Sequence, residues 1–412
     1  MSMNETPRSD RVHIALFGRR NAGKSSIINA LTGQDISIVS SVKGTTTDPV
    51  YKAMELLPLG PVVFIDTPGL DDDSELGEQR IQKTYEVLNK CDVALLICDE
   101  SGVGSFEEKI LKLIQAKSIP FIILINKIDR AQPDIALLKK YETQFKAKVL
   151  TTSAATGLGI ENLKLELAKI LPDDDSRFSI VRDLLSPMDT VVLVVPIDKA
   201  APKGRLILPQ QQTIRDILEA DAVSVVVKEN GLKEVLKNLG KKPRMVITDS
   251  QAFEKVAADT PPDIPLTSFS ILFARYKGDL MALAEGARAV ETLKDGDTVL
   301  IAEGCTHHKQ TDDIGTVKIP RWLRQYTGKN LNFEFSNGIK YPKELPKYAL
   351  IVHCGACMLN RREMNYRIDM ARESGVPIVN YGILIAYLKG ILERSVELFP
   401  DVHAALQKDR RA

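Results

Sequence analysis

The stretch VHIALFGRRNAGKSSIINAL, residues 12–31, decides the fold of the first part of this 412-residue chain. An apolar run ends at Gly18, and the residues that follow match the pattern G-x-x-x-x-G-K-[ST] before a helix-forming segment. In such a loop, glycines let backbone N–H groups curl around phosphate oxygens, and the N-terminus of the next helix favours an anion. The order of strand, loop and helix therefore predicts a phosphate-binding loop rather than an ordinary glycine turn.

Four further motifs follow this loop in the order expected of a nucleotide-binding domain. They are GTTTD at 44–48, DTPG at 66–69, NKID at 126–129 and TSA at 152–154. The hydroxyls of Ser25 and Thr46 are predicted Mg²⁺ ligands, with Asp66 beside the metal. The Asp129 carboxylate can accept hydrogen bonds from guanine N1–H and N2–H₂, a pair that adenine lacks. The five ordered motifs together predict a GTP site.

The predicted nucleotide site consists of two overlapping sets of residues. Binding of GTP or GDP is predicted for Gly18, Asn21, Ala22, Gly23, Lys24, Ser25, Ser26, Thr46, Asp66, Gly69, Asn126, Lys127, Asp129, Ser153 and Ala154. Catalytic roles are predicted for Lys24, Asn21, Thr46, Asp66 and Gly69. Lys24 can reach the outer phosphates, and the Gly69 amide can meet the γ-phosphate. Segments 34–50 and 66–80 are predicted to be switch loops that the γ-phosphate orders.

At these motifs the chain resembles the TRAFAC-class GTPases and, among them, the TrmE–Era group. The resemblance implies hydrolysis of GTP to GDP and phosphate. It also implies a potassium ion as a cofactor, because Asn21 stands where an asparagine marks potassium use in similar GTPases. Such a cation would stabilise charge developing at the phosphates, as an arginine finger does. Leu70 follows DTPG, where Ras-like enzymes have a water-orienting glutamine, so unaided hydrolysis is expected to be slow.

Apolar runs alternate with helical patterns along the whole chain, which predicts an α/β protein. We expect three domains. Residues 1–172 form a P-loop GTPase domain with a doubly wound, mostly parallel sheet. Residues 178–264 form a small α/β middle domain. Residues 265–412 form a C-terminal α/β domain with a parallel sheet.

Composition narrows the functional classes. Lysine plus arginine (55) nearly balance aspartate plus glutamate (54), so no basic footprint points to nucleic acid. The apolar runs are too short to span a bilayer, and the polar N-terminal residues lack the apolar core of a signal peptide. We therefore expect a cytoplasmic protein with no membrane or nucleic-acid partner. Its cysteines are then expected to stay reduced, which favours metal binding or redox chemistry over disulfides.

Three of the five cysteines lie in two short stretches, GCTHHK from Gly304 and HCGACMLNRRE from His353. Cys305 follows the apolar run TVLIA, and Cys354 follows YALIV. If these runs are neighbouring parallel strands, both cysteines emerge at the carboxyl edge of one sheet, where ligands of open α/β sheets bind. The other two cysteines, Cys91 and Cys98, are expected in the core of the first domain.

Four interpretations of this cysteine cluster are open from the residues alone. Cysteine can be a small core hydrophobe. The CGAC sequence fits a redox pair between a strand and a helix, although that leaves Cys305 without a role. A Cys₃His set fits structural zinc, although the first half, C-x-H, is not a usual zinc knuckle. A 4Fe–4S cluster held by three thiolates leaves one iron with an exchangeable ligand.

The pattern C-T-H, then forty-five residues, then H-C-x-x-C, behind a TrmE–Era-like GTPase domain, resembles the HydF family of FeFe-hydrogenase maturation GTPases. The resemblance covers essentially the whole chain. It implies a dimerising middle domain and a 4Fe–4S cluster held by Cys305, Cys354 and Cys357. Family members act as scaffold and carrier. They receive a transient diiron subcluster made with two radical-SAM maturases and transfer it to apo FeFe-hydrogenase, and the chain is expected to form a homodimer.

The fourth cluster ligand stays open. His307 and His353 occupy the histidine positions of the family, and each could ligate iron or only support the site through hydrogen bonds. Glu303 and an exogenous ligand are the other candidates. The basic segment RREMNYR after the second motif could bring positive charge to an anionic diiron unit, but a solvated helix face is the expectation for each arginine singly. The rival function is a TrmE–Era-like GTPase that acts on RNA through a structural zinc site.

Overall fold

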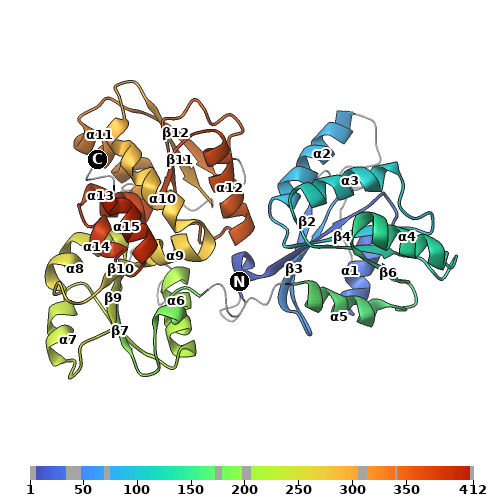
Figure 1. Ribbon diagram of the computed structural model, residues 1–412, viewed down its shortest axis with the longest axis horizontal. Helices are drawn as coiled ribbons and strands as arrows, with labels where there is room; N and C mark the ends of the chain where they lie inside the picture. Colours follow the sequence, from blue (N-terminus) through green and yellow to red (C-terminus); the bar gives the residue numbers. More distant parts are fainter. Residues whose placement is uncertain are drawn as a thin grey trace. The chain divides into compact units, whose positions relative to one another are not determined.

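The computed structural model describes residues 6–33, 48–68, 75–171 (75–81 by their backbone alone), 179–196, 206–304, 313–338 and 341–408. The chain forms two compact units, residues 1–174 and 175–412, whose elements are labelled in Figure 1. None of the described helices combines the length and the apolar character needed to cross a bilayer.

The first unit is built on a six-stranded sheet with the order β2-β3-β1-β4-β5-β6. Its strands are β1 (Val12–Phe17), β2 (Val50–Leu56), β3 (Gly60–Asp66), β4 (Val93–Cys98), β5 (Phe121–Ile125) and β6 (Lys148–Thr151). All neighbours pair in parallel except β2, which runs antiparallel to β3 at the edge. The central strands are continuous apolar runs because helices cover both of their faces.

Five α-helices cover this sheet: α1 (Lys24–Thr32), α2 (Glu75–Leu88), α3 (Ser105–Ala116), α4 (Ile135–Phe145) and α5 (Ile160–Ile170). Alternate residues of β1 face opposite sides, as a strand requires. Ala15 and Phe17 pack in a core with side chains of α3 and α4, whereas Ile14 and Leu16 pack with α1 and α5. The predicted doubly wound domain is therefore confirmed.

The second unit contains two four-stranded sheets in which every pairing is parallel. The first has the order β10-β9-β7-β8, from β7 (Thr190–Val194), β8 (Val223–Val227), β9 (Met245–Thr248) and β10 (Leu266–Ser268). The second has the order β12-β11-β13-β14, from β11 (Thr298–Glu303), β12 (Asn332–Asn337), β13 (Leu350–His353) and β14 (Ile378–Asn380). The parallel sheet predicted for the C-terminal segment is thus confirmed, and the sheet of the middle segment is parallel as well.

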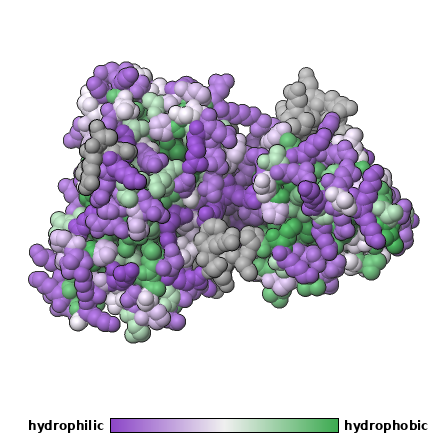
Figure 2. Space-filling view, viewed as in Figure 1, coloured by the Kyte–Doolittle hydropathy of each residue, from purple (hydrophilic) through white to green (hydrophobic). Residues whose placement is uncertain are grey.

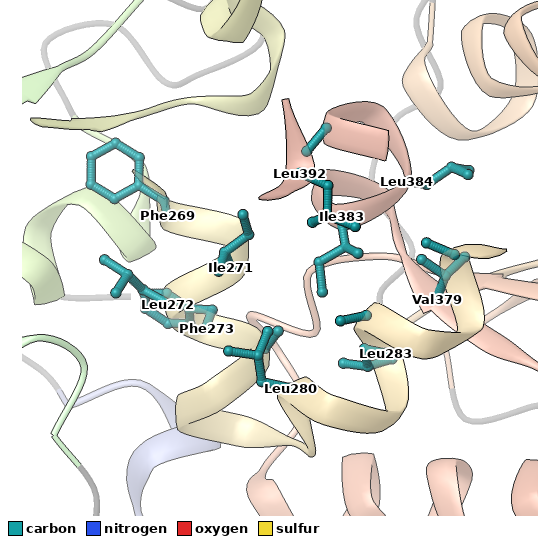
Figure 3. Packing of buried hydrophobic residues seen from close by; sticks show 14 of the residues in the cluster. Phe269, Ile271, Leu272, Phe273, Leu280, Leu283, Val379, Ile383, Leu384 and Leu392 are labelled. Carbon is teal, nitrogen blue, oxygen red and sulfur yellow. The ribbon is translucent and has the colours of Figure 1, made fainter. Parts of the chain in front are cut away.

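One continuous core joins the two sheets of the second unit. Its α-helices are α6 (Leu208–Glu219), α7 (Leu232–Asn238), α8 (Phe253–Asp259), α9 (Phe269–Lys277), α10 (Leu280–Gly286), α11 (Ile319–Thr327), α12 (Arg361–Glu373), α13 (Tyr381–Leu388), α14 (Leu392–Ser395) and α15 (Pro400–Lys408). Figure 3 shows buried side chains of α9 and α10 beside those of β14, α13 and α14. The helix α9 is therefore shared by both halves of this unit.

The predicted boundary at residue 264 cuts through the first of these sheets, since β10 lies beyond it and pairs with β9. The division into three domains stays a prediction, and the strand pairing favours a boundary after Ser268. On the face drawn in Figure 2, hydrophilic residues predominate over each unit, and hydrophobic residues form scattered patches. This distribution is ordinary for a chain whose apolar runs are buried in sheets.

Candidate functional site

Four of the five predicted nucleotide-binding motifs follow strands at the carboxyl edge of the first sheet, whereas GTTTD lies outside the described residues except for Asp48. The phosphate-binding loop follows β1, DTPG follows β3, NKID follows β5 and TSA follows β6. The chain crosses from β3 on one side of β1 to β4 on the other, so the loop after β1 lies at the point where strand order reverses. Ligands of open α/β sheets bind at such switch points.

The loop after β1 is already folded around the Lys24 side chain, which is buried. Its ammonium nitrogen donates hydrogen bonds to the carbonyl oxygens of Gly18 and Arg19, at 2.9 and 2.8 Å. These bonds hold the positive charge in the concavity of the loop, at the N-terminus of α1. Both the ammonium and the helix dipole favour a phosphate there.

Asn126 of NKID ties this loop to the base-binding side of the site. Its amide nitrogen donates to the carbonyl oxygen of Ala22 at 3.0 Å, and its amide oxygen accepts from the Ala154 backbone at 3.1 Å. A Cβ atom at Gly23 would lie 2.2 Å from the Asn126 amide nitrogen. Only glycine therefore fits at Gly23, where φ is also +99°.

The Asp129 carboxylate is exposed and oriented by a neighbouring hydroxyl. The Ser153 hydroxyl donates to it at 2.5 Å, and this bond lowers the pKa of Asp129. The carboxylate is therefore ionised at neutral pH and presents acceptor oxygens only. That arrangement suits the two adjacent N–H groups of guanine, as the sequence predicts.

Asp129→Asn is expected to weaken GTP binding by about 100-fold, because an amide cannot accept from both guanine N–H groups. The same variant should bind xanthosine triphosphate more tightly than the unchanged protein does, since xanthine has a carbonyl where guanine has an amine. Titration with fluorescent analogues of the two nucleotides measures both affinities. Asp134→Asn, an exposed N-cap of α4, is the matched control and should leave both unchanged. Equal GTP affinity in the two variants would contradict this base-recognition role.

Two predicted Mg²⁺-site residues contact each other directly. The Ser25 hydroxyl donates to the Asp66 carboxylate at 2.5 Å. Burial raises the pKa of Asp66, opposed by this bond and by Lys24. A hydroxyl and a carboxylate beside the phosphate loop are donors that suit a hard cation such as Mg²⁺. Thr46 and Gly69 lie outside the described residues, as does Leu70.

Asn21 adopts a left-handed backbone conformation, with φ of +62°, and is exposed. Its predicted role with potassium stays a prediction. Ser26 lies in the first turn of α1, and Lys127 has φ of +64° directly after Asn126. The described residues of the predicted nucleotide site thus lie in the loops, the start of α1 and the end of β3 at one sheet edge.

The described members of the second group of predicted site residues, which include His353, Cys354 and Cys357, lie at the carboxyl edge of the second sheet of the other unit. There β11 and β13 are adjacent and parallel, with Ala302 opposite His353. The backbone N–H of Gly304 lies 3.1 Å from the Cys354 sulfur. The backbone N–H of the residue before Cys305 is therefore in contact with Cys354, and the predicted parallel pairing of these two strands is confirmed. Cys305 and His307 themselves, like His308, lie outside the described residues.

The CGAC loop is held in an unusual backbone conformation. Ala356, between the two cysteines, has φ of +54° and is buried, a conformation that costs a non-glycine residue free energy. Directly after the loop, the Asn360 side chain caps α12 by accepting from the Glu363 backbone at 3.0 Å. The α12 helix therefore begins four residues after Cys357 in the chain, and the positive end of its dipole favours an anion near that end.

A buried lysine donates hydrogen bonds to backbone carbonyl groups in and after this loop. Lys277, the last residue of α9, is 2% exposed. Its ammonium nitrogen donates to the carbonyl oxygens of Cys357 and Leu359 at 3.2 and 3.1 Å. Sequence reasoning missed this residue, since nothing near Lys277 in the chain indicates a contact some eighty positions away.

His353 is fully buried, and both of its ring nitrogens are engaged. Nδ1 lies 2.9 Å from the Cys354 carbonyl oxygen, which can only accept, and Nε2 lies 3.0 Å from an Arg367 nitrogen, which can only donate. The ring is therefore neutral with its proton on Nδ1. Burial, followed by the nearby Arg367 charge, lowers the pKa of His353 to about 3. Neither nitrogen has a lone pair left for iron in this arrangement, which favours the supporting role over ligation.

The burial of Arg367 contradicts one expectation from the sequence. The basic segment after CGAC was expected to present solvated arginines, but Arg367 is 1% exposed. Besides His353, it donates to the Gly338 carbonyl and to the Glu363 carboxylate, both at 2.8 Å. The spacing of Glu363 and Arg367, four positions apart on one helix, is the sequence signal that could have indicated this pair.

Glu303 ends β11 two residues before Cys305 and is 4% exposed. One carboxylate oxygen accepts from the Tyr381 hydroxyl at 3.2 Å, and the other accepts from the Asn337 amide at 3.1 Å when that amide is oriented to donate. A Cβ atom at Gly315 would lie 2.7 Å from this carboxylate. Glu303 is thus fixed at the strand end by its surroundings.

The remaining two cysteines are buried, as the sequence predicts. Cys91 and Cys98 are 0% and 1% exposed in the core of the first unit, and burial raises the pKa of the Cys98 thiol. Among the described residues, no three His, Cys, Asp or Glu side chains are grouped as metal ligands, and two of the five predicted cluster ligands lie outside those residues. The two described thiols, Cys354 and Cys357, are soft donors at an edge with positive surroundings, which fits an anionic iron–sulfur cluster.

Family models match three segments of the chain. A model of the 50S ribosome-binding GTPases matches residues 13–127. A model described as the hydrogen maturase F dimerization domain matches residues 180–278, and one described as its tetramerization domain matches residues 281–398. The last two together cover more than half of the chain.

Individual relatives match the first unit. GTPase Era of Halothermothrix orenii is 34% identical over 39% of this chain and 55% of its own length. GTPase Der of Clostridium perfringens is 33% identical over 40% of this chain and 40% of its own length. A crystal structure of Aquifex aeolicus Era bound to GDP and aluminium fluoride covers 55% of this chain and 98% of its own, with 21% identity and a TM-score of 0.36. The chain thus spans about half, or less, of the length of these two curated relatives.

Both matched segments of the second unit are hydrogen maturase F domains, and they follow a P-loop GTPase domain. The chain therefore belongs to the hydrogen maturase F family.

Proposed function

We propose that this protein is a GTP-hydrolysing scaffold that binds a 4Fe–4S cluster through Cys305, Cys354 and Cys357. On this cluster it would receive a diiron subcluster from two radical-SAM maturases and deliver it to apo FeFe-hydrogenase. The observation that carries the proposal is the contact between the Gly304 backbone and the Cys354 sulfur, at 3.1 Å. It supports a common site for cysteines that are about fifty positions apart in sequence.

The chain's own residues have distinct tasks in this site. When bound, the cluster would supply an iron with an exchangeable position, to which the diiron cargo can attach. Lys277 and the N-terminus of α12 hold the CGAC loop and favour negative charge beside it. His353 fixes the Cys354 carbonyl and is itself fixed by Arg367. The fourth ligand, from His307, Glu303 or outside the protein, is left open by this assignment.

In the first unit, we propose that Lys24 stabilises charge on the outer phosphates while Ser25 and Thr46 bind Mg²⁺. Water then attacks the γ-phosphorus, and GDP leaves with the bridging oxygen. The Gly69 amide would orient the γ-phosphate, and Asn21 would hold a potassium ion near the transition-state charge. Because Leu70 cannot orient water, hydrolysis should depend on that cation. Equal rates in potassium and sodium buffers would refute the role of Asn21.

We further propose that hydrolysis gates partner binding rather than iron chemistry, because its site lies in the other unit. Affinity for a maturase that is identical with GDP and with a non-hydrolysable GTP analogue would count against gating. A cluster with an exposed iron is retained only in a reducing compartment. We therefore assign the protein to the cytoplasm.

Anaerobic reconstitution with iron and sulfide tests the cluster. We expect about four irons per chain and the EPR signal of a reduced 4Fe–4S cluster. Cys305→Ala, Cys354→Ala and Cys357→Ala should each lose most of this iron, whereas Cys91→Ala, in the core of the other unit, should keep it. One tightly held zinc, with no stable iron, would overturn the proposal. Together with RNA binding that weakens steeply with salt, that result would favour the rival RNA-acting GTPase.

The first sheet of the second unit has an exposed edge strand that suits association of two copies of the chain. The strand β8 lies at the edge of that sheet, with Val223 and Val226 38% and 47% exposed. An exposed apolar edge strand is a ready template for pairing with a second copy. It also lies in the segment matched by the dimerization model. We therefore propose a homodimer formed through β8.

Val226→Lys is expected to convert this dimer to a monomer at micromolar concentration, because a charge on the edge strand opposes pairing. Light scattering after size-exclusion chromatography gives the mass directly. Leu165→Lys, at a 54% exposed position on α5 of the other unit, is the control and should leave the mass unchanged. A Val226→Lys protein that stays dimeric would place the interface elsewhere.

A further inference from the structure

The last turn of α9 contacts two segments that are far apart in sequence. One is residues 179–183, the first described residues after the GTPase unit. The other is the loop that carries Cys354 and Cys357. Both contacts lie within the second unit, and both are made by consecutive residues of one helix, Arg275 to Lys277.

Arg275 binds the first of these segments through the two terminal nitrogens of its guanidinium group. Its two terminal nitrogens each donate to the Asp183 carboxylate at 2.7 Å. One of them also donates to the carbonyl oxygens of Ser179 and Ile180, at 3.1 and 2.8 Å. A bidentate pair with further backbone acceptors fixes both the position and the orientation of the segment.

The next two residues of α9 bind the cysteine loop. Arg361, at the start of α12, donates to the Tyr276 carbonyl oxygen at 2.9 Å. Lys277 donates to the carbonyl oxygens of Cys357 and Leu359, as described above. Three hydrogen bonds to or from charged groups therefore join the end of α9 to the loop, and such bonds are the stronger ones in proteins.

The helix between these contacts is well suited to act as a rigid connection. Five of its nine residues are buried apolar side chains: Phe269, Ile271, Leu272, Phe273 and Ala274. Figure 3 shows four of them packed within the shared core of the second unit. Packed helices move as bodies and transmit displacement, because cores are dense.

We propose that the last turn of α9 is the positioning element of the cysteine loop and couples that loop to the segment entering from the GTPase unit. A change in the contact between Arg275 and Asp183 would then alter the position of Cys357, because Arg275 and Lys277 lie in the same turn of α9. This inference rests on the proposed cluster site for its function. It also names a route by which the GTPase unit could act on that site.

Hydrogen exchange of the full-length, metal-free protein tests the coupling, and its outcome does not depend on whether iron binds. The amide of Leu359, which bonds to the Ala356 carbonyl at 3.1 Å, reports the loop. The amide of Val181, which bonds to Asp216 at 2.7 Å, reports the entering segment. In Arg275→Met we expect exchange to become roughly tenfold faster at both amides, because a charged hydrogen-bond network is lost. Amides of the central strand β7 should keep their wild-type rates.

Asp183→Asn is the second variant. Asp183 contacts α9 only from the side of the entering segment, so an effect of its replacement on Leu359 must pass through Arg275. We expect the same direction of change with a smaller size. Arg394→Met is the matched control, because Arg394 donates in the same way to the carbonyl oxygens of Ala257, Thr260 and Pro261.

Faster exchange at Leu359 in both test variants, with the wild-type rate in the control, supports the coupling. Wild-type exchange at Leu359 in Arg275→Met or in Asp183→Asn overturns it. Equal acceleration in Arg394→Met also overturns it, because the effect would then be general destabilisation. Failure of iron to bind in the reconstitution experiment would remove the proposed function and leave this mechanical result unchanged.

Discussion

Lys24→Ala is expected to reduce GTP hydrolysis by about 10²–10³-fold at saturating nucleotide, the cost of removing one preorganised charge from a transition state. In the structure the Lys24 ammonium is held by two loop carbonyls in the phosphate-binding concavity. It is therefore preorganised before nucleotide arrives, and an alanine leaves those carbonyls facing the phosphates. Phosphate release, measured with potassium and Mg²⁺ present, gives the rate.

Arg20→Ala is the control for this prediction, since Arg20 lies in the same loop but is exposed. Its rate should stay within about twofold of the wild type, as expected for an exposed side chain that is not among the predicted nucleotide-binding residues. If Lys24→Ala hydrolyses GTP within tenfold of the wild-type rate while its first unit still melts normally, the phosphates are bound elsewhere.

Sequence pattern predicted the central strands of this protein and the place where both sites form. Continuous apolar runs such as VALLIC and LIVH are buried on both faces, so they carry a strong signal. Once β11 and β13 are parallel neighbours, the residues after them must meet at one edge. The prediction for Cys354 therefore needed only the strand type and not the side-chain contacts.

The strands that pattern missed are all at sheet edges. The strand β2 has mostly half-exposed residues, β12 exposes Phe335, and β10 is only three residues long. An edge strand has a solvated side and needs no continuous apolar run. The helix α4 was also missed.

Buried charged residues were harder still to predict. Lys277 and Arg367 carry the charges of surface residues, and charge alone predicts exposure. Both are stabilised in the interior by hydrogen-bond acceptors. For Lys277 these are the carbonyl oxygens of Cys357 and Leu359, and for Arg367 they include Nε2 of His353. Apart from the four-residue spacing of Glu363 and Arg367, no local pattern contains their partners, so the other contacts could be found only from the fold.

Arg367→Met is expected to lower the free energy of unfolding of the second unit by about 3–5 kcal/mol, the usual cost of leaving a buried charge unpaired. Arg367 is the largest fully buried side chain of the described residues. Without it, the Glu363 carboxylate, the Gly338 carbonyl and His353 Nε2 each lose a donor in a site closed to solvent. Chemical denaturation of the full chain, followed by the single tryptophan, Trp322, in the second unit, measures the change.

Most of the lost stability should come from the unpaired Glu363 carboxylate rather than from the lost packing of the arginine. A double variant separates these two contributions. Removing both partners in Glu363→Leu/Arg367→Met should recover part of the stability, because a buried ion pair replaced by apolar groups costs less than a broken one. Arg372→Met, on the same helix but 58% exposed in its pair with Asp279, should cost no more than about 1 kcal/mol. A double variant as unstable as the sum of its single changes would mean that Arg367 acts through His353 and the cysteine loop instead, since removal of Glu363 would then bring no relief.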